Sequence, residues 1–200
     1  MIIKCYNENH NYLVFLDIEF NNRDLVQFAG LLFKRIDDEV YQLMRSCNQY
    51  IATKVCYPFM EYTSITNNFL ESNGVSLQDV QAIISDDFLA GVDLQEVLVI
   101  SHGLKNDRIT LLQNGINLSF RDNNKKLPVD GYCTFNNAKH ILERDNKLTA
   151  KDLAEECGYY IHQAHNAFND VWSEVAIFTY LRKIEKQKEV EECDLLTSTN

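Results

Sequence analysis

The stretch Tyr12-Leu-Val-Phe-Leu-Asp-Ile-Glu-Phe20 combines the composition of a buried β-strand with two acidic side chains near its end. Aromatic and β-branched residues favour strands. Because successive side chains of a strand point to opposite faces, Asp17 and Glu19 share one face with Leu13 and Phe15. Two carboxylates on one buried face repel each other, and a hard divalent ion between them would keep both ionised. The alternative is that the strand ends before the acids and that both are solvated.

The composition suits one α/β domain. Of the 200 residues 46% are hydrophobic, and only 7 Gly and 2 Pro are present, which argues against long linkers. The net charge of −10 disfavours tight, sequence-independent coating of nucleic acid or of an anionic membrane. No apolar run approaches the roughly 20 residues that cross a bilayer, and no signal segment opens the chain. The sequence therefore predicts a soluble, cytoplasmic protein without a membrane partner.

The order of the expected elements predicts a mixed sheet with helices on both faces. Strands at residues 12–20, 25–35 and 47–55 would form an antiparallel meander, in which only the connection over residues 37–44 has room for a helix. Residues 96–101 form a continuous apolar run, typical of a central strand covered on both faces. Helices are expected at residues 67–71, 76–89, 134–144, 149–156 and 162–188, with a further helix ending near residue 112. We expect a domain over residues 1–188 and a flexible C-terminal tail over residues 189–200.

Two further acids lie at positions where a strand or loop leads into a helix. Asp107 follows the apolar strand at residues 96–101, and Asp170 closes the stretch His165-Asn-Ala-Phe-Asn-Asp170. Five residues of a helix turn about 500°, so His165 and Asp170 converge only if the histidine lies on the loop before the helix. Taken alone, Asp107 also fits an acid favoured by a helix dipole, and His165 also fits a polar loop residue.

These motifs, in this order, resemble those of the DEDDh exonucleases, the superfamily that includes the proofreading subunits of bacterial DNA polymerase III. The resemblance covers about residues 12 to 182. It is carried by four stretches: Leu16-Asp-Ile-Glu-Phe20, Thr63-Ser-Ile-Thr66, Ile100-Ser-His-Gly-Leu-Lys-Asn-Asp107 and His165-Asn-Ala-Phe-Asn-Asp170.

The chain also departs from the family pattern. Gly103 stands where the family usually has Asn, Asn106 where it has an aromatic residue, and Thr63-Ser64 where it has His-Gly. These departures affect contacts to the terminal nucleotides rather than the acids. No sliding-clamp-binding sequence occurs near the C-terminus, so tethering to a replication clamp is unsupported.

The resemblance implies a ribonuclease H-like α/β fold with a mixed five-stranded sheet flanked by helices. It implies a metal-dependent 3′-to-5′ exonuclease that removes nucleoside 5′-monophosphates from single-stranded 3′ ends of nucleic acid, with DNA favoured over RNA. A polymerase or another replication or repair protein would be a fitting protein partner.

The resemblance also assigns residues. Two Mg²⁺ or Mn²⁺ ions would be held by the four acids, and His165 would act as general base. The metal-binding and catalytic acids implied are Asp17, Glu19, Asp107 and Asp170. The terminal nucleotide would lie against Ile18, Glu19, Phe20, Ile65, Thr66 and His165, with Phe20 as a stacking surface.

The sequence leaves two alternative functions open. One is a trimmer of RNA 3′ ends or short oligonucleotides with the same fold, because the sequence does not show whether a 2′-hydroxyl has room. The other is a catalytically silent module that binds nucleic acid or a polymerase. The presence of all four acids and of His165 disfavours the silent module.

Overall fold

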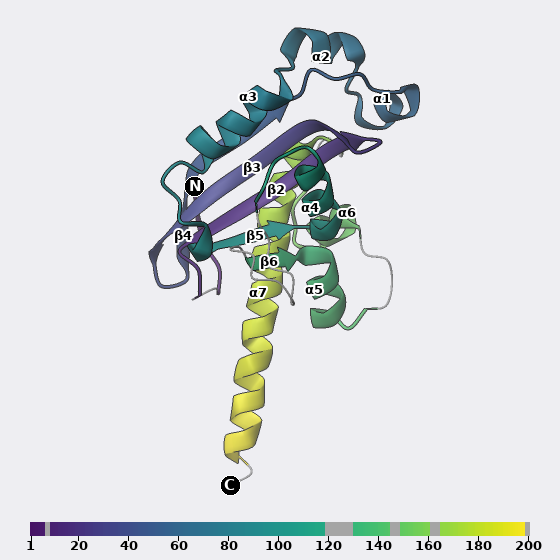
Figure 1. The fold of residues 1–200 in the computed structure, drawn as a ribbon. Coiled ribbons are helices and arrows are strands. Elements are labelled where there is room, and N and C mark those ends of the chain that lie inside the picture. The colour runs from purple at the N-terminus through teal and green to yellow at the C-terminus, as the bar shows by residue number, and fades with distance from the viewer. Residues whose placement is uncertain (7–8, 119–129, 145–148, 161–164, 199–200) are drawn as a thin grey trace.

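A six-stranded mixed sheet organises the chain, with the strand order β1-β4-β3-β2-β5-β6 (Figure 1). The computed structural model describes all residues except 7–8, 119–129, 145–148, 161–164 and 199–200, and it describes side chains only as far as Asp194. The strands are β1 (Ile2–Lys4), β2 (Tyr12–Asn21), β3 (Asp24–Asp37), β4 (Val40–Tyr50), β5 (Val97–Ser101) and β6 (Asp130–Cys133).

The centre of the sheet confirms the predicted meander. β2, β3 and β4 pair antiparallel through short turns, and Asn22 and Arg23 adopt positive φ angles in the first turn. β5 pairs parallel with β2, with Phe15 opposite Ile100. Because parallel strands end at the same edge of a sheet, this register brings the loop after β5 to the acidic end of β2.

The edges of the sheet differ from the prediction. The sheet has six strands rather than five, because β1 pairs with β4 and β6 with β5. The third strand covers Val40–Tyr50 rather than residues 47–55. Glu39 has a φ of 58° in the turn before this strand, so the chain reverses sharply and no helix forms at residues 37–44.

The helices largely follow the expected order, and polar side chains cap several of them. Thr66, Ser76 and Thr149 each accept a hydrogen bond from the backbone N–H three residues ahead, which satisfies a donor of the first turn. The helices are α1 (Tyr57–Thr63), α2 (Asn67–Asn73), α3 (Leu77–Ala82) with its π-helical continuation η1 (Ile83–Phe88), the 3₁₀ turn η2 (Leu94–Glu96), α4 (Leu104–Gln113), α5 (Thr134–Ile141), α6 (Ala150–Glu156) and α7 (Ala167–Ser198).

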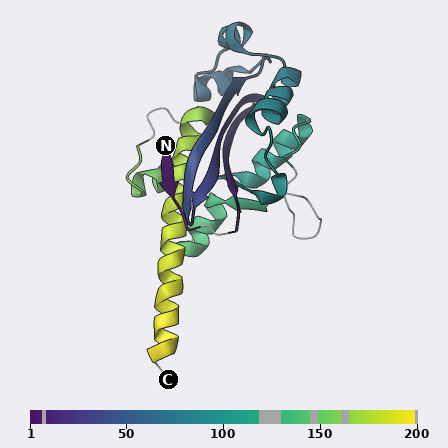
Figure 2. The same cartoon turned by 90° about the vertical axis from the view of Figure 1, so that its left-hand side faces the viewer.

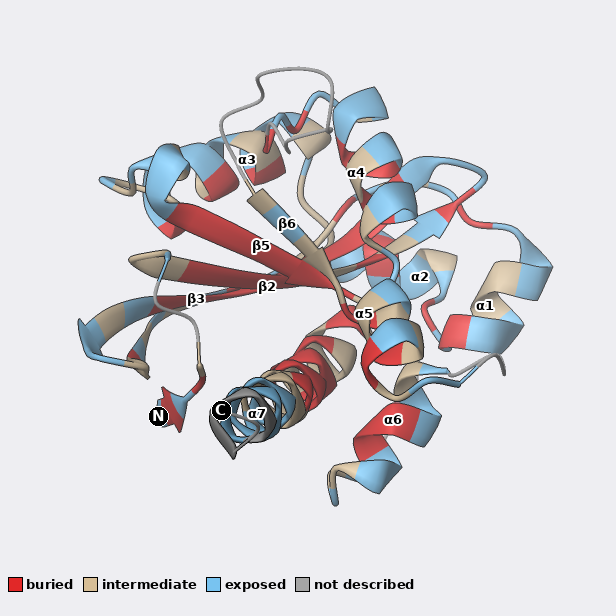
Figure 3. Cartoon of the chain, turned by 90° about the horizontal axis from the view of Figure 1, so that it is seen from below, coloured by how far each residue is buried: buried red, intermediate tan, exposed pale blue. Residues whose placement is uncertain are grey.

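Helices cover both faces of the sheet, as predicted (Figure 3). The side chains of Leu13 and Phe15 on β2 pack against α7 residues such as Phe178. The alternate residues of β2, Val14 and Leu16, belong to the apolar cluster that α3, η1 and α4 build on the opposite face. The two-residue period of β2 therefore assigns Asp17 and Glu19 to the α7 face.

The last helix is longer than predicted. α7 runs to Ser198, past the expected end at residue 188, and its C-terminal part projects beyond the sheet (Figure 2). Residues 189–194 are exposed, whereas Val171, Phe178 and Leu181 are buried. Among the described residues, no helix combines the length and the apolar composition of a membrane span.

Candidate active site

Three carboxylates from two distant parts of the sequence meet where β2 ends and α7 begins. One oxygen atom from each of Asp17, Glu19 and Asp170 lies within 4.8 Å of the others. The strand period points the first two toward α7, and Asp170 lies in the first turn of that helix. Carboxylates grouped this closely form a site that could hold a divalent cation.

Asp107 lies beside this group. It is in the first turn of α4, directly after the loop that follows β5, and only 6% of its surface is exposed. Its carboxylate accepts a hydrogen bond from the buried hydroxyl of Ser101. The charge of Asp107 raises the pKa of both Asp17 and Glu19, so the four acids share one electrostatic environment.

Burial raises the pKa of every member of this group. Burial, followed by the neighbouring carboxylates, raises the pKa of Asp17 well above its ordinary value and that of Glu19 to about 7. Burial raises the pKa values of Asp107 and Asp170 to about 6. In the part of the chain that the structure describes, no Lys, Arg or His side chain forms an ion pair with these four acids. The cluster therefore lacks a compensating positive charge from the described residues.

His165 lies on the loop before α7, which is the position that its spacing from Asp170 requires. Its backbone adopts a φ of 65°, and its N–H donates a hydrogen bond of 3.0 Å to Oδ2 of Asp170. Its ring stacks on the ring of Tyr62, with centroids 3.6 Å apart and planes tilted by 33°. Burial lowers the pKa of His165, which favours the neutral imidazole. A neutral imidazole can accept a proton.

The remaining residues that were predicted to contact the terminal nucleotide differ in how far they are exposed. Phe20 is 40% exposed at the end of β2. Ile18 is buried on the face of the sheet that lies opposite α7. Ile65 is buried in the apolar cluster that contains Val26. The hydroxyl of Thr66 accepts a hydrogen bond of 3.2 Å from the backbone of α2. Of these side chains Phe20 offers the exposed apolar surface, and Ile18 and Ile65 could meet a ligand only through their backbones.

Glu174 is an acid near this group that the sequence analysis missed. It lies one turn after Asp170 on α7, is 2% exposed, and accepts a hydrogen bond of 2.8 Å from the Thr134 hydroxyl. The same hydroxyl lies 3.0 Å from Nδ1 of His102. Burial, with repulsion from Asp107 and Asp170, raises the pKa of Glu174 to about 8. An acid within the apolar stripe of a helix was the signal that could have revealed it.

Tyr62 was also missed. It lies on α1, immediately before the Thr63-Ser-Ile-Thr66 stretch, and its side chain is 61% exposed although its ring covers His165. Burial and the nearby charges of Glu19 and Asp170 raise its pKa. The exposed aromatic residue beside a candidate motif was the available signal.

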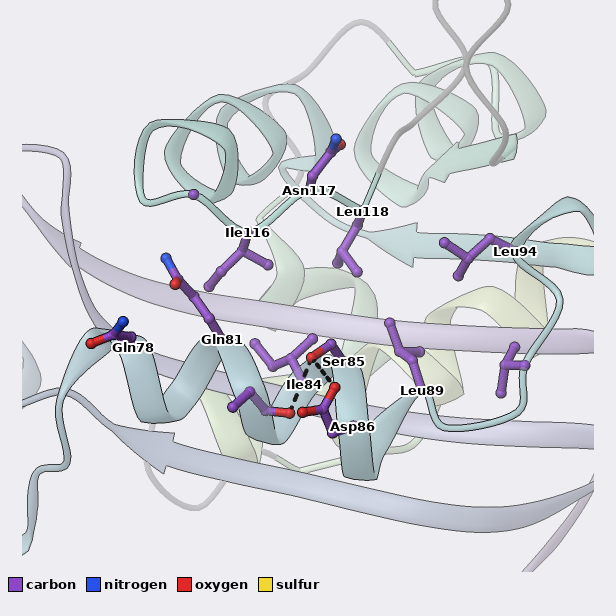
Figure 4. Close-up of a pocket in the computed structure, with 13 residues that line it drawn as sticks. Gln78, Gln81, Ile84, Ser85, Asp86, Leu89, Leu94, Ile116, Asn117 and Leu118 are labelled. Atoms are coloured by element: carbon purple, nitrogen blue, oxygen red, sulfur yellow. Dashed lines mark hydrogen bonds between the residues drawn. The ribbon is translucent and has the colours of Figure 1, made fainter.

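A pocket with a volume of about 600 Å³ lies away from these acids (Figure 4). Ile84, Ile116 and Leu118 line it, and all three belong to the apolar cluster on the face opposite α7. Gln78 and Gln81 of α3 contribute polar groups to its rim. The pocket therefore lies on the face of the sheet opposite the one that carries Asp17 and Glu19.

Comparison with solved structures identifies proteins that share the fold of this chain. No protein-family model matches the chain, and no curated protein matches it in sequence. The structure of exonuclease X in complex with 5′-overhanging duplex DNA matches with a TM-score of 0.60, over 86% of this chain and 91% of that one, at 15% identity. The nuclease domain of 3′hExo, a DEDDh family member bound to rAMP, matches with a TM-score of 0.64, over 90% and 94% of the two chains, at 12% identity.

The chain has the same fold as these two exonucleases. The structure of E. coli exonuclease I in complex with a dA16 oligonucleotide also matches, with a TM-score of 0.66 and 14% identity, over 88% of this chain and 42% of that one. At such identities the likeness establishes the architecture, and it confirms the predicted ribonuclease H-like α/β class. What this chain does with the shared fold depends on its own residues.

Proposed function

We propose that this protein is a metal-dependent 3′-to-5′ exonuclease that hydrolyses phosphodiester bonds at single-stranded 3′ ends, with DNA favoured, and releases nucleoside 5′-monophosphates. One observation carries the proposal. The end of β2, the start of α4 and the start of α7 bring four carboxylates and a histidine together in a DEDDh fold. The six cysteines are scattered along the sequence without a Cys-x-x-Cys pair, which suits a reducing compartment such as the cytoplasm.

The residues present suit two divalent ions. Oxygen is the donor that Mg²⁺ and Mn²⁺ prefer, and these carboxylates lack a cationic partner among the described residues. Asp17, Glu19 and Asp170 would hold one ion, and Asp17 with Asp107 the second. When bound, such ions lower the pKa of water and offset the charge of the leaving oxygen.

His165 supplies the proton acceptor. In its neutral form it takes a proton from the attacking water while the water oxygen bonds to phosphorus and the 3′-oxygen of the preceding nucleotide leaves. The hydrogen bond from its backbone to Asp170 fixes the loop that presents the ring. Phe20 provides a surface on which the terminal base can stack.

An RNA 3′-end trimmer is the second candidate. The structural neighbours include 3′hExo bound to rAMP and a 3′-exonuclease that recognises a histone mRNA stem-loop, beside the DNA complexes. The two candidates differ only in whether the site accepts a 2′-hydroxyl. A silent module that binds nucleic acid or a replication or repair polymerase would keep the fold and lack the cleavage.

The test is a cleavage assay with 5′-labelled single-stranded DNA, duplex DNA, RNA and a dinucleotide in Mn²⁺ or Mg²⁺. We expect shortening from the 3′ end, fastest on single-stranded DNA, and we expect Asp17→Ala to lower the rate on the order of 100-fold or more. Asp38→Ala is the matched control, because this exposed acid lies in the turn between β3 and β4.

Three outcomes separate the candidates. Faster cleavage of RNA than of DNA would favour the RNA trimmer. Binding without shortening in either metal would favour the silent module. Equal rates for the wild type and Asp17→Ala would refute the proposed site.

A further inference from the structure

Gln27 is a fully buried amide inside an otherwise apolar part of β3. Its exposed fraction is 0%, and it lies between Val26 and Phe28, which are also fully buried. A buried side-chain amide is costly unless its donors and its acceptor are satisfied. The partners of this amide therefore indicate why the chain places it here.

The sheet places Gln27 in the same row as Glu19. The two residues are opposite each other in the pairing of β2 with β3, and Tyr50 is opposite Gln27 in the pairing of β3 with β4. Directly paired residues point to the same face of a sheet. Glu19, Gln27 and Tyr50 thus form one row across three strands, on the face that α7 covers.

Gln27 and Tyr50 both bind the start of α7. Oε1 of Gln27 accepts a hydrogen bond of 3.1 Å from the backbone N–H of Ala167, and its Nε2 lies 3.5 Å from Oδ1 of Asn166. The amide of Asn166 also donates to the hydroxyl of Tyr50 over 3.2 Å. Nε2 of Gln27 donates to Asn48 over 2.9 Å, which fixes the orientation of the amide.

The segment held in this way carries the proposed base and one proposed metal ligand. Asn166 follows His165 directly, and its carbonyl accepts the backbone N–H of Asp170 over 2.9 Å. The N–H of His165 donates back to the carboxylate of Asp170. A shift of Asn166 would therefore move His165 and Asp170 together, relative to Glu19.

We propose that Gln27 is a positioning residue that anchors the segment His165–Asp170 to the row of the sheet that carries Glu19. This inference rests on the proposed nuclease function. It adds to that function a requirement for an amide at position 27. Only a group that both donates and accepts can hydrogen-bond to the Asn48 side chain and to the Ala167 N–H at the same time. Glu at this position would lose the donors, and Leu would lose both functions.

The test compares Gln27→Leu with Tyr41→Phe. Tyr41 is a fully buried residue of β4, and its hydroxyl donates to the carbonyl of His10, so the control also removes a hydrogen bond made by a buried side chain of the same sheet. For each variant kcat and KM are measured on labelled single-stranded DNA, and Mn²⁺ affinity is measured by titration calorimetry without nucleic acid.

For Gln27→Leu we expect kcat to fall on the order of 100-fold, because a shift of about 1 Å in a reacting group has an effect of that size. KM should change by less than about twofold, since the change affects the reacting groups more than substrate binding. Mn²⁺ affinity should fall roughly 10-fold, as for other changes in the residues that orient a metal ligand. Tyr41→Phe should change none of the three.

A double-mutant cycle with Asn166→Ala adds a measurement that a purely structural role of Gln27 would not change. If Gln27 acts through Asn166, the double variant should lose less activity than the product of the two single losses. Tyr50→Phe covers the case in which Gln27→Leu does not fold. It removes one hydroxyl that contacts Asn166 and should lower kcat roughly 2- to 10-fold.

The proposal is overturned if folded Gln27→Leu keeps the kcat and the Mn²⁺ affinity of an active wild type. It is also overturned if Tyr41→Phe loses as much kcat as Gln27→Leu, if the cycle is additive, or if, where Gln27→Leu does not fold, Tyr50→Phe keeps the wild-type kcat. A wild type that neither binds Mn²⁺ nor shortens nucleic acid is a different result, since it refutes the proposed function itself.

Discussion

Glu174 shows how one buried side chain couples charge to stability. Its pKa rises from 4.5 to about 8 in the folded chain, so the native state binds a proton that the unfolded state has already lost over that range. Its favourable contribution is complete below about pH 4.5 and is lost as the pH rises through about 8.

The variant Glu174→Gln cannot ionise and should escape this loss. In metal-free protein at pH 9 we expect it to be more stable than the wild type by on the order of 1 kcal/mol or more, with a much smaller difference at pH 5. Urea unfolding at the two pH values measures the gap. Glu71→Gln, a change of an exposed acid on α2, is the control. A gap that stays constant between the two pH values would contradict the assignment.

Tyr62 supports the ring of His165, the proposed general base. An aromatic pair contributes about 0.5–1.5 kcal/mol, so Tyr62→Ala should lower kcat roughly 2- to 10-fold through a less ordered His165. Tyr62→Phe keeps the ring and should retain the rate. Tyr57→Ala, at a 70% exposed position of the same helix, serves as control in the labelled-oligonucleotide assay. Equal losses in the two alanine variants would argue against a specific role of the stack.

At the scale of the element, α7 divides into two parts with different roles. Phe178 is fully buried and its ring meets those of Phe15 and Tyr132 edge to face, with centroids 5.5 and 5.0 Å away. Phe178→Ala should therefore lower the free energy of unfolding by about 3–5 kcal/mol.

Deletion of residues 189–200 should have little effect on stability, because residues 189–194 are exposed. We expect Tm to change by less than about 2 °C, which corresponds to at most about 0.5–1 kcal/mol in a chain of this size. Thermal unfolding of the shortened chain beside Phe178→Ala measures the contrast. A large loss of Tm on deletion would show that the end of α7 belongs to the folded core.

For the whole molecule, the acidic cluster predicts opposite effects of pH and of metal ions. Glu19, with a pKa of about 7, and Asp107 and Asp170, with pKa values of about 6, all titrate above their ordinary range in the fold. The native state therefore binds more protons than the unfolded state between about pH 4 and pH 7, and the stability of the metal-free protein should fall as the pH rises through this window.

Divalent ions should reverse that fall. Each 1 kcal/mol changes Tm by about 2–4 °C at this chain length, so Mn²⁺ should raise Tm by several degrees at pH 8 and by much less at pH 5. Differential scanning fluorimetry with Mn²⁺, with Mg²⁺ and with a chelator measures this. Asp17→Asn should weaken both effects, and an ion-induced shift of equal size at both pH values would count against the carboxylates as the binding groups.

The sequence was sufficient where a pattern is local. The alternation of β2, the meander and the capped helices follow from neighbouring residues. The spacing from His165 to Asp170 showed that the two could converge only with the histidine before the helix, but the expected helix over residues 162–188 began too early, since α7 begins at Ala167. The sequence was insufficient where partners come from distant strands. The edge strands β1 and β6 have only three and four residues and depend on pairing with β4 and β5.

The same limit applied to the site. Glu174 and Gln27 look like isolated polar residues in apolar stretches, and their roles become visible only when Thr134 and Asn166 are brought next to them. No local spacing connects those pairs, since each joins different elements of the fold.

The projecting end of α7 has a practical consequence. A helix of 32 residues is about 48 Å long, and the carboxylates lie at its beginning. A dye, a bead or a surface linker joined beyond Ser198 would therefore be held far from the place where a nucleic acid end would arrive. The chain could be immobilised through the C-terminal end of α7 for single-molecule recording, with the acidic end of β2 facing the solution.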